Sequence, residues 1–225
     1  GLGDVYKRQA VECPPTFGVS RELVVGLIAG GDKAFVEAVE GAEDSETLCE
    51  ADLKEIGLTS KDIVIGLAAS GRTPYVIYGL DFANKTGCHT VAIACNKGSD
   101  VGKKARLAIE PVTGPEVLTG STRLKAGTAQ KMILNMISTG SMVGIGKAYE
   151  NLMVDVKQSN EKLVVRSQNI VMTATGCTRE EAETVLKQAE GHVKTAITMI
   201  LLDCEPEAAR QKLSQAGGKI REALK

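Results

Sequence analysis

A short polar stretch, Ser70-Gly71-Arg72-Thr73, has the residue types and the position expected of an anion-binding loop. It follows a continuous apolar run, Ile63 to Ala69, which is typical of a strand buried on both faces of a parallel sheet. It precedes Pro74, which favours the first position of a helix, with Thr73 as the N-cap. Backbone N–H groups and hydroxyls at such a turn can bind a phosphate. The pattern also fits an ordinary connection between a strand and a helix.

A second polar, glycine-bearing stretch, TGSTRLKAGT, covers residues 119–128. Ser121 and Thr122 offer hydroxyls, and Arg123 and Lys125 offer positive charge, which together would suit a phosphorylated sugar. The stretch leads into a long helix that the apolar spacing predicts over about 129–149. A solvated helix entry explains the same residues equally well.

Two carboxylates are candidates for acid–base chemistry. Glu12 precedes Cys13-Pro14-Pro15, which predicts a rigid turn that fixes the direction of the side chain. Glu43 lies in a short acidic segment, residues 39–44. A reaction that moves protons to and from carbon and oxygen needs such groups, but each glutamate taken alone also fits a surface acid.

Several common catalytic signatures are missing from the sequence. Ala68 stands where a G-x-S-x-G elbow around Ser70 needs glycine, and its last position is Arg72. No P-loop and no G-x-G-x-x-G after a strand is found. Only two histidines occur, His89 and His192, which disfavours a histidine-based triad or a multi-histidine metal site.

Composition indicates an ordinary globular protein of 225 residues with a net charge of -1. That charge gives no reason to expect nucleic acid or an anionic membrane surface as a partner. The longest early apolar run is too short to span a bilayer, and no secretory leader is recognisable. The six scattered cysteines are typical of reduced, mostly buried thiols in a cytoplasmic protein.

Strand and helix patterns alternate through the first two thirds of the chain. Buried strands are expected at residues 23–29, 63–69, 89–95 and 106–112, with a helix capped by Asp32 after the first of them. This order predicts an α/β fold with a doubly wound parallel sheet flanked by helices. Beyond about residue 150 the pattern becomes helical, with segments at 160–174, 179–189, 193–202, 206–214 and 219–224. We therefore expect three regions, 1–9, 10–150 and 151–225, of which the last is a small helical module.

Taken together, these residues resemble the bacterial N-acetylmuramic acid 6-phosphate etherases, which have a sugar isomerase (SIS) fold. The strings that carry the resemblance are ECPPTFGV (12–19), VVGLIAGG (24–31), VEGAEDS (39–45), GLAASGRTPYV (66–76), TGSTRLKAGTAQK (119–131), NLMVDV (151–156) and NEKLVVR (160–166). The C-terminal region resembles the ubiquitin-associated-like (UBA-like) helical module of that family. Residues 1–9 do not resemble the family, whose first strand and glycine-rich loop are expected to be missing here.

The resemblance implies cleavage of the D-lactyl ether of a 6-phosphorylated amino sugar by β-elimination and water addition. It implies that Glu12 is the proton donor and Glu43 the second acid/base, which we assign to the hydrogen at C2. Ser70, Gly71 and Thr73 match the phosphate-binding loop of the fold, and Ser121 and Lys125 are further candidates for substrate contact. No metal or organic cofactor is implied, and the partners implied are the phosphorylated amino sugar and a second subunit in a cytoplasmic homodimer.

Two other functions remain open from the sequence. A phosphosugar aldose–ketose isomerase would share the fold and the Ser70 loop, although the ECPPTF and VEGAED strings argue against it. A sugar-phosphate sensor that resembles the glucokinase regulatory protein would bind the ligand without turning it over.

Overall fold

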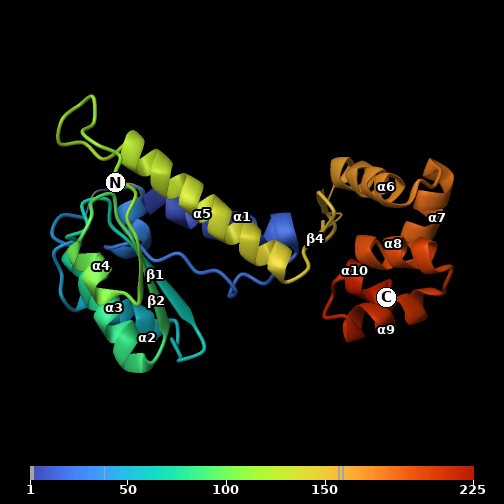
Figure 1. Cartoon of the computed structure of the whole chain (residues 1–225), viewed down its shortest axis with the longest axis horizontal. Helices are drawn as coiled ribbons and strands as arrows, with labels where there is room; N and C mark the ends of the chain where they lie inside the picture. The colour runs from blue at the N-terminus through green and yellow to red at the C-terminus, as the bar shows by residue number, and fades with distance from the viewer. Residues whose placement is uncertain (1–2, 38, 157, 159) are drawn as a thin grey trace. The chain divides into compact units, whose positions relative to one another are not determined.

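The computed structural model describes residues 3–37, 39–156, 158 and 160–225. These residues form two compact units (Figure 1). The first consists of Gly26–Asn135 with the N-terminal residues through Gln9, and the second of Ala10–Val25 with Met136–Lys225. The division falls within two helices, α1 (Gly3–Phe17) and α5 (Lys125–Gly144), so each helix contributes residues to both units.

A three-stranded parallel sheet forms the centre of the first unit. Its strands β1 (Ile63–Leu67), β2 (His89–Ile93) and β3 (Leu107–Ile109) are paired in the order β1-β2-β3. Parallel neighbours need a crossover connection, and here α3 (Pro74–Thr86) joins β1 to β2 while α4 (Asp100–Lys104) joins β2 to β3. The predicted α/β class with a parallel sheet is confirmed.

Helix α3 covers the sheet with an apolar face. Leu80 and Ala83 are fully buried, and Val76 packs against the same core. Pro74 is the first helical residue and Thr73 is the N-cap, although the Thr73 side chain makes no capping hydrogen bond. The helix ends at Gly87, which has a φ of 94° that only glycine adopts without strain.

A second layer in the first unit is formed by α2 (Leu48–Glu55), which packs on α3. Cys49 and Leu53 of α2 are buried against Tyr75 of α3. The Tyr75 hydroxyl donates a hydrogen bond of 2.6 Å to Asp52 Oδ2. Burial is the main cause that raises the pKa of Tyr75. A buried hydroxyl that is satisfied in this way fixes how the two helices face each other.

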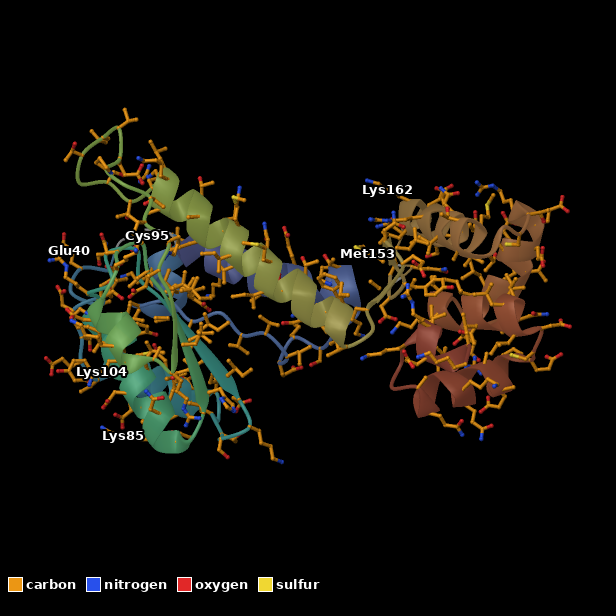
Figure 2. The ribbon with its side chains drawn as sticks, in the orientation of Figure 1. Glu40, Lys85, Cys95, Lys104, Met153 and Lys162 are labelled. Carbon is orange, nitrogen blue, oxygen red and sulfur yellow. The ribbon has the colours of Figure 1, made fainter. Side chains whose placement is uncertain are left out.

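One ion pair lies within α3 and another connects α3 to α4. Figure 2 labels Lys85 and Lys104, whose ammonium groups lie 2.8 and 3.3 Å from the two oxygens of Asp81. The hydrogen bond from Lys85, followed by that from Lys104, lowers the pKa of Asp81. The two ammonium groups are exposed to water and Asp81 is partly exposed, so the pairs orient side chains more than they stabilise the fold.

The strand expected at residues 23–29 does not form. The segment has no regular secondary structure, and Leu23 and Val25 are 54% and 50% exposed. A strand needs a neighbour that satisfies its backbone N–H and C=O groups, and no described strand pairs with this run. The prediction of a helix that starts at Asp32 is also wrong. Only a short 3₁₀ helix, Gly31–Phe35, occurs there, and its N-cap is Gly30.

The prediction of a rigid turn at residues 13–15 is also wrong. Helix α1 begins at Gly3 and continues through Cys13, Pro14 and Pro15, where the sequence predicted a rigid turn. Both prolines lie in the last turn of the helix, where each lacks the N–H that would pair with the carbonyl four residues before it, and the chain leaves the helix at Gly18. The absence of a family first strand is not tested and stays a prediction.

The second unit is mainly helical, as the sequence predicts. After a hairpin of β4 (Ala148–Tyr149) and β5 (Leu152–Met153), five helices follow: α6 (Glu161–Thr175), α7 (Arg179–Gln188), α8 (Val193–Leu202), α9 (Pro206–Gln215) and α10 (Ile220–Ala223). Their common core includes Val154, Val171 and Ile197, all fully buried. Among the described residues, no helix is both long and apolar enough to pass through a membrane.

The close packing of α2 on α3 makes a prediction about Gly79. A Cβ at this position would lie 2.2 Å from Cys49 Sγ. We expect Gly79→Ala to lower the free energy of unfolding by about 1–3 kcal/mol, because the helices must separate. Chemical denaturation of the full chain measures the change.

Two further variants test the cause of that loss. Adding Cys49→Ala to Gly79→Ala should recover part of it, because the sulfur is the atom that clashes. Gly140→Ala in α5, where no atom lies within 4 Å of the new Cβ, should instead stabilise by about 0.5–1 kcal/mol. Equal losses in Gly79→Ala and Gly140→Ala would contradict the packing argument.

Candidate functional site

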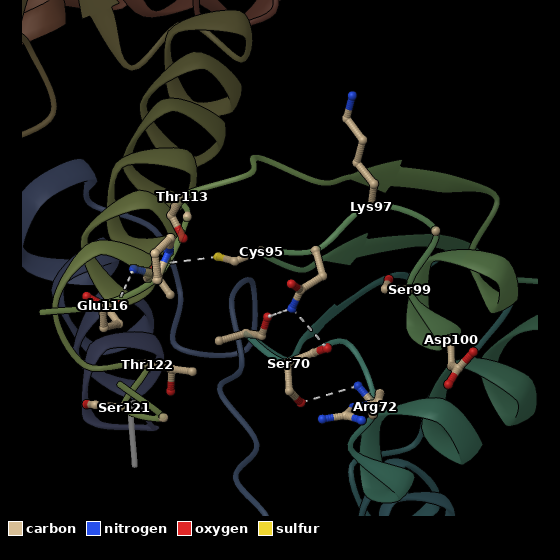
Figure 3. Close-up of a pocket in the computed structure, with 17 residues that line it drawn as sticks. Ser70, Arg72, Cys95, Lys97, Ser99, Asp100, Thr113, Glu116, Ser121 and Thr122 are labelled. Atoms are coloured by element: carbon tan, nitrogen blue, oxygen red, sulfur yellow. Dashed lines mark hydrogen bonds between the residues drawn. The ribbon is translucent and has the colours of Figure 1, made fainter. Parts of the chain in front are cut away.

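An open cavity of about 510 Å³ lies in the first unit, at the carboxyl ends of its three parallel strands. It is lined by residues that follow β1, β2 and β3, and by the segment that leads into α5 (Figure 3). In open α/β sheets, ligands bind at this edge. Ser70 and Ser121, which the sequence placed in two separate polar stretches, line the same cavity.

Gly71 shapes the turn between β1 and α3. Its φ is 74°, and a Cβ there would lie 2.4 Å from the Cβ of Ser99. Its carbonyl accepts the N–H of Val101 at 3.1 Å. Only glycine combines this backbone conformation with so close an approach, so the turn is held directly against the start of α4.

Hydrogen bonds hold both the side chain and the carbonyl of Ser70. Its Oγ accepts the N–H of Arg72 at 3.3 Å, and its carbonyl accepts a hydrogen bond of 3.2 Å from Asn96 Nδ2. The same amide nitrogen also donates to the carbonyl of Ala69 at 3.3 Å. Asn96 follows β2, so the second strand positions the loop that follows the first. Thr73 lies farther along, at the N-cap of α3, and is not one of the residues that line the cavity.

Glu110, which follows β3, holds the loop after β2. Its carboxylate accepts the N–H of Gly98 at 2.8 Å, the N–H of Ser99 at 3.0 Å and the Ser99 hydroxyl at 2.7 Å. The Ser99 hydroxyl is the main cause that lowers the pKa of Glu110, followed by the two backbone N–H groups. The Ser99 Oγ also caps α4 by accepting the N–H of Gly102. One carboxylate thus sets the wall of the cavity on this side.

Glu116 holds the segment that enters α5 by accepting backbone N–H groups. It is almost fully buried, and its two oxygens accept the N–H groups of Lys125 and Ala126, each at 3.0 Å. These hydrogen bonds, first that of Lys125 and then that of Ala126, lower the pKa of Glu116. They satisfy N–H groups that a helix start leaves without an internal partner. Glu116 therefore fixes where Ser121 and Thr122 lie in the cavity.

Positive charge lies close to the cavity but does not fill it. The Lys125 side chain reaches toward Gly114, a residue of the lining, with its ammonium 3.7 Å from where a Cβ at that glycine would stand. Arg72 and Lys97 both contribute to the lining, and the side chain of Lys97 extends away from the other labelled residues (Figure 3). An anion in the cavity would meet hydroxyls first and cations at the rim.

The two predicted catalytic glutamates lie on different units. Glu43 is exposed in the first unit, and its carbonyl accepts the N–H of Tyr75 at 3.0 Å. This bond attaches its segment to the first turn of α3, close in sequence to the Ser70 loop. Glu12 is exposed on the part of α1 that belongs to the second unit.

The sequence alone did not identify four residues of the site: Asn96, Ser99, Glu110 and Glu116. Each follows the carboxyl end of β2 or β3, which is the signal that could have identified them. Sequence alone could not show that these side chains support backbone groups of other segments. Among the described residues, no three histidine, cysteine, aspartate or glutamate side chains form a group that could hold a metal ion. The six cysteines, all free in the structure, include four that are buried.

The role of Glu116 predicts a pH-dependent stability. Glu116→Gln should lower the unfolding free energy at pH 7, because its amide N–H would face a backbone N–H. The lowered pKa means that Glu116 stabilises the fold fully above the ordinary glutamate value of about 4.3, and that this effect is lost as pH falls through the lowered value. Unfolding of the variant and of the unchanged chain should therefore converge in acid. Glu55→Gln, an exposed change at the end of α2, serves as the control, and a difference that stays constant with pH would contradict the assignment.

Three family models match parts of the chain. The model described as glucokinase regulatory protein N-terminal SIS domain matches residues 10–84. The model described as SIS domain matches residues 54–139, which include the sheet and the cavity. The C-terminal lid domain of glucokinase regulatory protein matches residues 150–192.

Similar proteins carry one name. Proteins called N-acetylmuramic acid 6-phosphate etherase from Bacillus cereus (strain 03BB102) and Bacillus anthracis (strain A0248) are 60% identical to this chain over 215 residues. The protein of that name from Geobacillus sp. (strain WCH70) is 61% identical over the same length. Each alignment covers 96% of this chain and 73% of the relative. By this identity and coverage, the chain belongs to the N-acetylmuramic acid 6-phosphate etherase family.

Proposed function

We propose that this chain cleaves the D-lactyl ether of N-acetylmuramic acid 6-phosphate, giving N-acetylglucosamine 6-phosphate and D-lactate. The identity of about 60% to proteins named for this reaction carries the proposal. The cavity supports it, because hydroxyls and backbone turns converge at the strand ends where a sugar phosphate would bind. The enzyme is thus a carbon–oxygen lyase acting in amino-sugar catabolism and peptidoglycan recycling.

The chemistry follows from the open-chain form of the sugar. Its C1 aldehyde makes the hydrogen at C2 acidic, because the carbanion delocalises into the carbonyl. Glu43 takes this proton, the C2–C3 double bond forms, and the C3–O bond breaks as Glu12 gives a proton to the departing lactate oxygen. Water then adds its hydroxyl to C3 and a proton to C2. The two carboxyl groups need opposite protonation states at the start, so their environments must differ.

Ser70, Gly71 and Thr73 are proposed to hold the 6-phosphate. The Thr73 hydroxyl supports this assignment because it makes no capping hydrogen bond to its own helix. Ser121 and Lys125 are proposed to contact the same ligand from the α5 side, which Glu116 holds in place. All of these groups bind and orient the substrate, and none is required to move a proton.

The wider organisation follows the same proposal. We assign residues 10–150 to the sugar-phosphate-binding SIS domain and 151–225 to a helical module of the UBA-like kind, with 1–9 apart from both. The matches of the SIS and lid-domain models to residues 54–139 and 150–192 support a change near residue 150. We further propose a homodimer that works in the cytoplasm.

Glu43→Gln tests the proposed base. Removing the carboxylate should lower D-lactate release from N-acetylmuramic acid 6-phosphate by about 10²–10⁴-fold. Binding of N-acetylglucosamine 6-phosphate, measured by calorimetry, should stay within about twofold. Glu40→Gln, an exposed change three residues upstream, is the matched control.

Unchanged turnover in Glu43→Gln would remove this residue from the mechanism. If the unchanged chain binds the sugar phosphate but releases no lactate, a sugar-phosphate sensor becomes the better assignment. Ketose phosphate without lactate would favour the isomerase.

Ser70→Ala tests the proposed phosphate loop. Losing one hydroxyl should raise KM for the phosphorylated substrate about tenfold, with a smaller change in kcat. Turnover of unphosphorylated N-acetylmuramic acid, however slow, should not respond to the change. Ser60→Ala, an exposed serine before β1, controls for the substitution itself. An equal loss toward both substrates would refute the phosphate assignment.

A further inference from the structure

A second open cavity, of about 300 Å³, lies within the second unit. The residue Lys147, the segment after β5, the first turn of α8, and residues of α9 line it. None of these residues belongs to the cavity at the strand ends of the first unit. It is a separate set of charged groups that the proposed etherase chemistry does not use.

Cations outnumber carboxylates in this cavity. Asp155 is its one carboxylate among the residues that line it, and Lys147, Lys194 and Arg210 are its cations. The ammonium groups of Lys147 and Lys194 lie 2.9 and 2.8 Å from the same oxygen, Asp155 Oδ2. His192 Nε2 lies 3.8 Å from the other oxygen, Oδ1. Two ammonium groups on one oxygen repel each other, and Asp155 can neutralise only one of them.

Burial makes this imbalance costly. The side chains of Asp155 and Lys194 are only 8% and 7% exposed. Arg210 contacts Glu190 and Glu207 at 3.3 and 3.4 Å, but both of these carboxylates are exposed, so water screens their effect. The cavity therefore keeps a positive charge that no described side chain cancels within it.

The start of α8 adds to the positive potential. This helix has ten residues, and three residues at its beginning, His192, Lys194 and Thr195, line the cavity. His192 is the N-cap but makes no side-chain capping bond, because its Nδ1 lies 2.6 Å from Thr195 Oγ1 instead. A helix start carries partial positive charge and favours an anion.

We propose that this cavity is a binding site for a small phosphate-bearing anion. Two lysines, an arginine and the start of a helix are the groups that bind phosphate in proteins, and a dianion would neutralise the excess charge. The volume suits a phosphate with at most a small organic part. The ligand is inorganic phosphate or a phosphate ester, which share the group that the site recognises.

His192 gives a direct readout of occupancy. Its ring is faced by the Asp155 carboxylate, the Thr195 hydroxyl and the cationic groups of Lys147, Lys194 and Arg210. Burial is the main cause that lowers its pKa, which Asp155 raises and the nearby cations lower further. An anion bound beside the ring favours the imidazolium, so binding must raise the pKa of His192.

The experiment is an NMR titration of the histidine rings in the full chain. The chain has two histidines, and exposed His89 at the start of β2 in the first unit is the internal reference. His192→Gln assigns the signals. Sulfate, a dianion throughout the titration, should raise the pKa of His192 in a saturable way relative to chloride at equal ionic strength, and should leave His89 unchanged. At fixed pH, inorganic phosphate and glucose 6-phosphate should each shift the His192 signal saturably.

Variants separate the site from general screening. Arg210→Gln should weaken anion binding by about tenfold, because it removes one charge-assisted contact. Lys187→Gln, an exposed lysine of α7 outside the cavity, should leave the affinity unchanged. Asp155→Asn should strengthen binding, since it removes the competing carboxylate. Circular dichroism establishes whether each variant is folded. If Asp155→Asn does not fold, Arg210→Gln still tests the site.

The order of the two phosphate ligands identifies the source. Saturation by glucose 6-phosphate at lower concentration than inorganic phosphate assigns the site to phosphate esters, and the reverse order assigns it to the free anion. No saturable shift of His192, or an equal response in Arg210→Gln and Lys187→Gln, overturns the proposal. The titration does not depend on lactate release, so it tests this site independently of the etherase proposal.

Discussion

The parallel pairing of β1 with β2 and of β2 with β3 is the constraint on which the rest of the first unit depends. Because all three strands run in one direction, the chain leaves the sheet three times at the same edge. The ladder continues past the strand ends, with the N–H of Ala68 donating to Ile93 and that of Ala94 donating to Ile109, each at 3.1 Å. A slip of one residue would turn every side chain to the opposite face, so this register also decides which residues reach the cavity.

Small residues in the strands let the helices come close enough to fix that register. A Cβ at Gly66 would lie 2.7 Å from Val76 Cγ1 and 2.9 Å from Leu80 Cδ1. The lack of a side chain at Gly66 therefore lets α3 pack closely on β1. Helix α3 begins directly after the turn that contains Ser70. Packing in the core therefore adds to the local contacts of Gly71 and Asn96 that hold the loop in place.

Carboxylates have two different duties in this molecule. Glu110 and Glu116 accept backbone N–H groups, which favours the ionised form and holds the loops around the cavity. An acid bound in this way is poorly suited to exchange protons with a substrate. Glu12 and Glu43, proposed for that exchange, have exposed side chains. The contacts of the carboxylate oxygens, which residue type does not reveal, therefore identify Glu110 and Glu116 as supporting groups.

Buried charge gives the second unit a different character. Replacing a buried ion pair by apolar residues is often neutral or favourable for stability, so Asp155 and the lysines that face it are poor candidates for a purely stabilising role. The surrounding core, which includes Val154, Val171 and Ile197, is apolar and well buried. A small helical module with such a core has little structural need for a buried lysine at the start of α8.

Elements whose signals are local could be predicted from the amino-acid sequence. The helical patterns predicted the positions of α6, α7 and α8 to within a few residues, and Thr73-Pro74 predicted where α3 starts, because hydrogen bonds and side-chain spacing within a helix involve near neighbours. The sequence also predicted the polar loop at Ser70 and the parallel class. Only the tertiary structure decided that residues 23–29 form no strand, since a strand needs a partner from elsewhere in the chain. It alone brought Ser70 and Ser121 to one cavity and gave Glu110 and Glu116 their roles, because those contacts join segments that only the folded sheet places side by side.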